Sequence, residues 1–250
     1  MRIIMRTTII ACLLPTTLFA DGFYVGVEGG YNVAGIQKGN TNFISAAPNG
    51  ILGSTNAYTN LTSFAEGGLG GLYVGYGKRQ MDGVYLGAEL NGDLNAASAN
   101  TVDTSVKPEA NVTEKLRNDL GLSLLAGYFL TNSSLLYGRV GGVWSKFESD
   151  SFSAGFDGAS GDFSKKLLGG RLGIGMETYI TCQISLRGEY DYTFYESFVQ
   201  NSTFPFQVDP TIPTFSVPTS NHYTLRSNQF LLGLAYHFNI GNDDAKTAAV

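Results

Sequence analysis

The sequence predicts an all-β fold, an eight-stranded antiparallel up-and-down transmembrane β-barrel with four long extracellular loops. Eight segments alternate between apolar and polar or small residues with a period of two, which is the spacing of a β-strand. The connections between these segments alternate between long and short along the chain. After residue 20, no stretch reaches the ~20 apolar residues that a transmembrane helix needs, so a membrane could be crossed only by a closed barrel of strands.

The first twenty residues predict a leader that is removed from the folded protein. Arg2 and Arg6 precede an apolar run at 7–19, and the small residue Ala20 stands before a cleavage site ahead of Asp21. We therefore expect a secretory signal peptide at residues 1–20, the barrel at residues 21–238 and a short C-terminal tail at residues 239–250. An alternative, lipoprotein processing at Cys12, would leave too short an apolar stretch for a signal core.

The expected strands follow one another with a regular rhythm. Their ranges are 22–34, 69–79, 84–98, 118–130, 135–148, 166–178, 184–198 and 225–238. Tight turns are expected at 80–83, 131–134 and 179–183, and long polar loops at 35–67, 99–117, 149–165 and 199–224. Long connections on one rim and tight turns on the other are typical of bacterial outer-membrane barrels. A water-soluble eight-stranded barrel, such as a lipocalin, has the same strand order and is the structural alternative.

The chemistry of the two strand faces favours the membrane alternative. Between 184 and 192, Ile184, Leu186 and Tyr190 alternate with charged residues at 187, 189 and 191, so one face is apolar and the other charged. Across the strands, the polar faces carry glycine, serine and isolated ionised residues rather than the rows of Lys and Glu that suit open water. We therefore expect the apolar rows to face lipid and the charges to face the lumen.

The inward charges should form an ion-pair network, because charges in a narrow lumen are costly unless they pair. Extending the alternation gives its expected members, Glu28, Glu89, Arg139, Arg171, Glu177, Arg187, Glu189 and Asp191. We favour the interpretation that they plug and brace the barrel, since eight strands leave an interior just wide enough for side chains. The alternative is that they line a water-filled path and set its ion selectivity.

The long loops hold aromatic residues among prolines and few charges. Aromatic side chains supply contact area and prolines limit the conformations lost on binding, so a host or surface protein or glycan could dock there. The candidate contact residues are Phe43, Tyr58, Phe204, Phe206, Phe215 and Tyr223. The alternative is that these rings pack on one another or on lipid headgroups.

Nucleic-acid, metal and catalytic functions are poorly supported. Without Arg2 and Arg6, 14 basic residues face 21 acidic ones, which excludes a nucleic-acid partner. The acidic residues of the third loop lack the compact spacing of a calcium loop, so neither a metal nor another cofactor is expected. His222 and His237 are the only histidines, and Ser220 beside His222 is not a catalytic constellation, so we expect no enzyme.

Several segments carry a family resemblance that covers almost all of the chain after the leader. Residues 136–144, 170–179 and 186–192 resemble the second half of the eight-stranded outer-membrane β-barrel family, which includes opacity-type surface proteins and the OmpA-like transmembrane domain. Residues 22–31 and 233–238 are similar to that family's first and last strands. The resemblance implies a bacterial cell outer-membrane location, contact with outer-membrane lipid and lipopolysaccharide, and insertion by the barrel-insertion machinery.

The chain departs from the family pattern after its last strand. Family members usually end on an aromatic residue that resembles Phe238 and serves as the insertion signal, whereas this sequence continues to Val250. The tail is too short for the peptidoglycan-binding domain of larger relatives. Three functions follow as hypotheses: a non-enzymatic surface barrel whose loops serve adhesion or host contact, a narrow porin-like channel for ions or small solutes, and an outer-membrane lipid-modifying enzyme that uses His222 or His237.

Overall fold

A computed structural model describes residues 22–44, 55–103, 110–153, 160–206 and 215–239, and these residues are almost entirely β-strand. Its strands are β1 (Gly22–Ile44), β2 (Thr55–Arg79), β3 (Val84–Asn95), β4 (Ser98–Asp103), β5 (Ala110–Phe129), β6 (Ser134–Ser153), β7 (Ser160–Tyr179), β8 (Ile184–Tyr195), β9 (Phe198–Phe206) and β10 (Phe215–Asn239). A single 3-10 turn, η1 (Met81–Gly83), joins β2 to β3. In the described residues no helix has the length and apolarity needed to cross a membrane.

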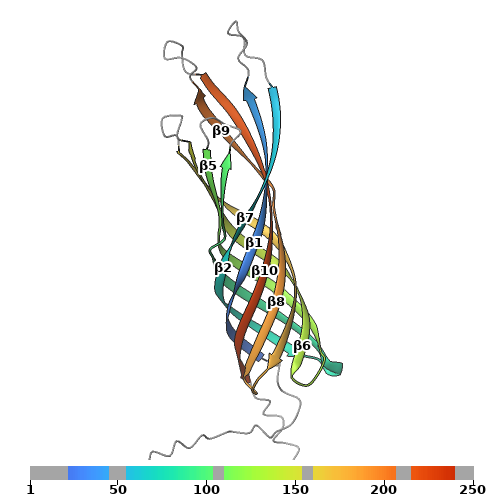
Figure 1. Ribbon diagram of the computed structural model, residues 1–250. Coiled ribbons are helices and arrows are strands. Elements are labelled where there is room, and N and C mark those ends of the chain that lie inside the picture. The colour runs from blue at the N-terminus through green and yellow to red at the C-terminus, as the bar shows by residue number, and fades with distance from the viewer. Residues whose placement is uncertain (1–21, 45–54, 104–109, 154–159, 207–214, 240–250) are drawn as a thin grey trace, which may run out of the picture.

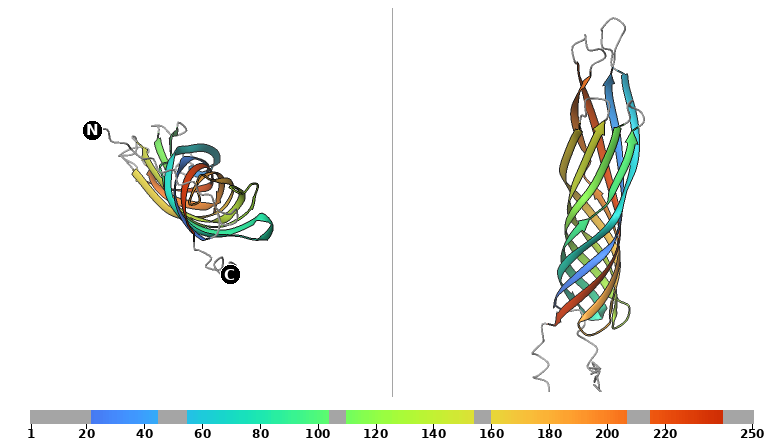
Figure 2. Two further views of the ribbon diagram at one scale, coloured as in Figure 1. Left: turned by 90° about the horizontal axis from the view of Figure 1, so that it is seen from below. Right: turned by 60° about the vertical axis from the view of Figure 1, so that its left-hand side comes forward.

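The strands close into an antiparallel ring of eight, which confirms the predicted fold class. Each strand pairs with its neighbours in the order β1, β2, β3, β5, β6, β7, β8 and β10, and β10 pairs back onto β1. Strand β4 continues the path of β3 and β9 that of β8, each after a two-residue break. The start of β1 and the end of β10 lie at the same end of the barrel as the tight turns, which is the periplasmic end of such barrels (Figure 2).

The strands are longer than the sequence predicted, and the loops correspondingly shorter. Strand β1 runs to Ile44 instead of ending at residue 34, and β2 begins at Thr55 instead of residue 69. Likewise β6 runs to Ser153 and β7 begins at Ser160, so much of the ranges expected to be loops is paired strand. The remaining tips, the expected signal peptide and residues 240–250 of the expected tail lie outside the described residues.

The outer face of the lower barrel is a continuous apolar band. Leucines from strands all around the ring stand more than half exposed, for example Leu124 at 63%, Leu172 at 52% and Leu232 at 69%. Exposed aromatic residues, including Phe23, Tyr128 and Phe238, lie near the ends of the strands. This is the surface that a barrel presents to lipid.

Above the apolar band the strands separate into two facing sheets, which we call the extension. The closed ring ends on one side at the backbone hydrogen bond from Glu196 N to the Leu168 oxygen (2.9 Å). On the other side it ends at the bond from Ala96 N to the Gly68 oxygen (3.0 Å) and the adjoining pair of Glu66 on β2 and Ser98 on β4. Beyond them, the described pairings give one sheet of β2, β1, β10 and β9 and another of β4, β5, β6 and β7. Figure 1 shows these groups of strands rising from the barrel.

The extension has a hydrophobic core of its own. It is formed by inward side chains from both sheets, namely Ala34, Ile36, Ala65, Ala97, Ala99, Leu116, Phe147, Leu167, Tyr195, Phe198, Tyr223 and Leu225, with Phe163 packed against them. The ring centroids of Phe147 and Phe198 lie 5.7 Å apart across the two sheets, and Phe198 stacks on Tyr223 at 5.0 Å. Because such packing holds the two sheets together, the extension continues the barrel as a folded body.

Candidate functional site: the charged lumen and the extension

Two buried arginines hold the centre of the lower lumen. Arg187 of β8 places Nη2 2.8 Å from Glu28 Oε2 and Nη1 2.6 Å from Glu89 Oε2. Arg139 of β6 contacts Glu89 from the other side and places Nη1 2.7 Å from Glu189 Oε1. Each arginine therefore binds more than one carboxylate, and Glu89 bridges the two guanidinium groups.

The third predicted arginine lies one layer further up. Arg171 Nη1 is 3.6 Å from Asp191 Oδ2, and the same nitrogen donates to Asn91 Oδ1 at 3.3 Å. Asp191 also lies 3.3 Å from Arg139, so it links the two layers. The structure thus brings together seven of the eight residues proposed from the sequence.

The eighth residue, Glu177, is paired in register with Arg187, but its hydrogen bonds run to other residues towards the periplasmic end. It accepts a hydrogen bond from Ser185 Oγ at 2.6 Å and pairs with His237 Nε2 at 2.8 Å. The ring of His237 also packs against Tyr24 and Tyr179, with centroid distances of 5.3 and 4.8 Å. Glu177, Ser185 and His237 therefore pack together at the periplasmic end of the lumen and, within the described residues, add no ion pair to the arginine–carboxylate network.

The Ser185, His237 and Glu177 side chains do not form a catalytic triad. In a triad the serine and the acid bind opposite nitrogens of the imidazole. Here Ser185 Oγ and Glu177 Oε1 both approach Nε2, at 3.0 and 2.8 Å, and all three side chains are buried. His222, the other candidate, is exposed on β10 opposite Gly39.

Sequence reasoning missed several buried polar residues of the same lumen. Asp93 and Asp119 are inward and 4% and 3% exposed, and Gln229 donates to Asp119 Oδ2 at 3.1 Å. The signal was present, because Asp93 has the same alternation as Glu89, and Asp119 that of the inward Ser123. Within the described residues no group of three or more potential ligands could hold a metal ion. Asp150, which was expected in the third loop, lies on β6 and is paired with Lys115 Nζ at 2.8 Å.

Tyrosine rings fill the lumen around the arginines, and glycines paired with them on the neighbouring strand make room for them. A side chain at Gly26 would overlap the ring of Tyr73, and one at Gly75 would overlap that of Tyr24. The Arg187 guanidinium lies 3.8 Å from the centre of the Tyr73 ring, a cation–π contact. These close approaches leave the charged layer packed by side chains.

Clusters of aliphatic and aromatic side chains lie at both ends of this charged layer. Towards the periplasm the inward residues form a cluster of Tyr85, Leu125, Phe129, Leu135, Tyr137 and Tyr179. Towards the outside, the core of the extension begins one inward position beyond Asp119, at Leu116. The charged layer therefore lies between two clusters of packed side chains, and the lower cluster also adjoins the polar group of Glu177, Ser185 and His237.

The aromatic contact candidates fall into two groups. Tyr223 does not lie in an exposed loop: it is 1% exposed on β10 within the core of the extension, and burial raises the pKa of its phenol to about 12. The other five lie near the outer ends of strands, Phe43 on β1, Tyr58 on β2, Phe204 and Phe206 on β9 and Phe215 on β10. Because β1 pairs with β10 as far as Asn42 and Thr219, the first and fourth predicted loops meet on one sheet.

The family comparison agrees with this architecture. Residues 15–238 match the model of the outer membrane protein beta-barrel domain family, and the chain belongs to that family. It is therefore an outer-membrane β-barrel. No curated protein matches the chain significantly.

Among solved structures the chain is similar to several outer-membrane proteins at low identity. The attachment invasion locus protein Ail of Yersinia pestis is 14% identical, with 88% of this chain and 100% of that chain covered and a TM-score of 0.37. OprG of Pseudomonas aeruginosa is 15% identical, covering 88% and 97%, with a TM-score of 0.42. The outer membrane protease OmpT of Escherichia coli is 12% identical, covering 89% and 98%, also with a TM-score of 0.42.

Proposed function

We propose that this protein is a non-enzymatic surface barrel whose extension presents a contact surface for a protein or glycan outside the cell. The observation that carries the proposal is the packed core of the extension, in which Phe147, Phe198 and Tyr223 join the two sheets. A core of this kind fixes the strands beyond it in one arrangement. Binding at their ends would then cost less conformational entropy than binding by loose loops.

The positions of the aromatic residues support the same proposal. On the sheet of β2, β1, β10 and β9, Phe43 is one position beyond the last β1–β10 pair, and Phe206 pairs with Phe215 where β9 and β10 meet. Tyr58 is opposite Thr41. Residues far apart in sequence are thereby gathered at the outer end of a single sheet, as a contact surface requires. Aromatic residues are also enriched where proteins bind partners.

The test is to remove these aromatics while leaving the strands paired. We expect cells that display a Phe43→Ser, Tyr58→Ser, Phe204→Ser and Phe206→Ser variant to lose adhesion to host cells and binding to glycan arrays. The matched control is Tyr128→Ser, a 53% exposed aromatic at the periplasmic end of the apolar band. Heat-dependent migration on gels will show that the quadruple variant is still a folded barrel. Unchanged adhesion by such a folded variant would contradict the proposal.

The layered lumen counts against the narrow-channel hypothesis. A water-filled path would have to cross both clusters of packed side chains as well as the paired charges between them. We expect the refolded protein to give no discrete conductance steps in planar bilayers. Reproducible steps that change on neutralising Arg139 or Arg171 would make the channel the better hypothesis.

A further inference from the structure

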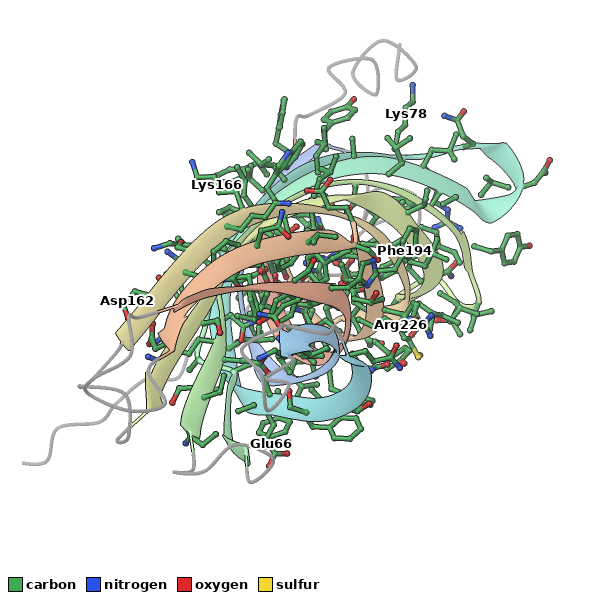
Figure 3. All side chains as sticks on the ribbon, turned by 90° about the horizontal axis from the view of Figure 1, so that it is seen from above. Glu66, Lys78, Asp162, Lys166, Phe194 and Arg226 are labelled. Carbon is green, nitrogen blue, oxygen red and sulfur yellow. The ribbon has the colours of Figure 1, made fainter. Side chains whose placement is uncertain are left out.

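Three basic residues form a row across the outer face of the barrel. Arg117 on β5 is paired in register with Lys146 on β6, which is paired in turn with Lys166 on β7. The Arg117 and Lys146 side chains are 39% and 46% exposed, and Lys166 is exposed on the outer rim (Figure 3). Like charges on directly opposite residues destabilise a sheet, so folding alone does not account for the row.

The row lies at the upper edge of the apolar band. The next outward row towards the periplasm is Leu120, Trp144 and Leu168, again in register, and these residues are 50%, 49% and 48% exposed. Tryptophan is enriched where a membrane protein passes from hydrocarbon to headgroups. The basic row therefore stands at the depth of the headgroups of the outer leaflet.

Neighbouring acidic residues compensate only part of this charge. Glu148 pairs with Lys146 at 2.6 Å and with Arg117 Nε at 3.6 Å, and the hydrogen bond from Lys146 lowers the pKa of Glu148. Within the described residues, Lys166 has neither an ion-pair nor a hydrogen-bond partner. One carboxylate thus faces three cations.

Beyond this row on the same wall, the outward cation Lys115 is ion-paired with Asp150 at 2.8 Å. Further from the membrane, Asp150 lies opposite Asp162. On other walls, Glu66 of β2 and Arg226 of β10 are outward charges of opposite sign (Figure 3). Within the described residues, the uncompensated positive charge of this wall therefore lies in the row, beside the headgroup layer at β5, β6 and β7.

We propose that Arg117, Lys146 and Lys166 bind the phosphate groups of an outer-leaflet glycolipid. Guanidinium binds phosphate with two parallel hydrogen bonds, and ammonium binds it as a point charge. Neighbouring strands are about 4.8 Å apart, so the row spans roughly 10 Å, which suits a headgroup with more than one phosphate. The site would hold one wall of the barrel to lipid, and it is independent of any partner at the outer end of the extension.

The experiment compares lipid binding by the refolded full chain in neutral phosphatidylcholine nanodiscs. The probes are diphosphorylated lipid A and the same lipid without phosphates. We expect the unaltered protein to bind the phosphorylated lipid more tightly than the lipid without phosphates. The single variants Arg117→Gln, Lys146→Gln and Lys166→Gln and the triple variant should lose affinity for the phosphorylated lipid by about fivefold for each neutralised cation. Lys78→Gln, which removes an exposed lysine near the periplasmic end of β2, is the matched control and should bind as the unaltered protein does.

Three outcomes would overturn the site. The triple variant could bind phosphorylated lipid as the control does, or the unaltered protein could bind both lipids equally. Alternatively, inorganic phosphate at the same phosphate concentration could displace the lipid, which would reassign the row to a soluble anion. If the triple variant does not fold, the test uses Lys166→Gln alone, because Lys166 has no ion-pair partner within the described residues. Unchanged affinity of this single variant for the phosphorylated lipid would then overturn the site.

Discussion

The lower barrel and the extension use the same strands with opposite chemistry. Below the two closing hydrogen bonds, leucines such as Leu124 and Leu172 face outwards while Arg139 and Arg187 are buried inside. Above them, Lys146 and Lys166 face outwards while the core of the extension is buried inside. The alternation of faces continues along β6 and β7 without interruption, and only the polarity inverts. The surroundings therefore decide which face is apolar: hydrocarbon lies outside the lower barrel, and headgroups and water lie around the extension.

Two strands change their alternation at the junction of these regions. In β5 the inward residues are Leu116 and then Asp119, because Asn118 is an extra residue at a bulge and has a φ of 34°. Asparagine tolerates this left-handed conformation better than most residues. Between β8 and β9, the exposed pair Glu196 and Ser197 produces the same change of phase. Because of these breaks, polar residues face inwards in the lower barrel and apolar residues face inwards in the extension.

The largest expected effect comes from breaking the charged layer. Changing Arg187→Met leaves Glu28 and Glu89 buried without their shared cation, and removing one partner of a buried ion pair costs about 3–5 kcal/mol. We expect a lower midpoint of urea unfolding for the whole barrel in detergent or lipid. Arg226→Met, at an exposed position on β10, should leave the midpoint nearly unchanged. Equal midpoints for both variants would contradict the bracing role of the network.

The same comparison shows how far the sequence alone could predict the structure. Below the junction, period-two alternation with apolar rows outside gave the strand order, the closed ring and most of the inward charges. Above it, polar outward rows resembled loop sequence, and the phase changes at Asn118 and Glu196 broke the pattern. The pairing of Glu177 with His237 instead of an arginine depends on how far the strands of the ring are shifted relative to one another. The alternation along a single strand carries no information about that shift.

An equally sized deletion in the extension should have a local effect. Phe147→Ala removes the ring that contacts both Phe198 and Tyr223. Loss of a buried phenylalanine costs about 3–5 kcal/mol, and we expect this loss to lower the free energy of opening of the extension alone. We expect faster amide hydrogen exchange in β9 and the upper part of β6, with the lower barrel unchanged. Phe194→Ala removes an outward ring that is 49% exposed and should leave exchange in the extension unaltered. Uniform loss of protection would mean that the two regions unfold together.

Crowding of the charged layer should have an intermediate effect. Gly75→Ala puts a methyl group into the ring of Tyr24, which donates to Glu89 Oε2 at 3.0 Å, and overpacking of this kind costs about 1–3 kcal/mol. The midpoint of urea unfolding should fall by less than for Arg187→Met. Gly92→Ala is the control, since no atom lies within 4 Å of the added carbon. If both glycine variants unfold alike, the lumen is less tightly packed than the tyrosine contacts indicate.

The smallest effect is expected at a buried acid in the extension, and it should depend on pH. Glu114 is 3% exposed and accepts a hydrogen bond from Ser63 Oγ at 2.5 Å, and burial raises the pKa of its carboxyl group. A raised pKa in the folded state means that the folded extension binds more protons than the unfolded one, so its stability falls as the pH rises above the unfolded value of about 4.3. Glu114→Gln keeps an acceptor for Ser63 and removes the charge. Hydrogen exchange in the upper part of β5 should therefore be a few-fold slower than in the unaltered protein at pH 7 and equal to it at pH 4. A slowing of the same size at both pH values would assign the effect to packing instead of to the buried charge.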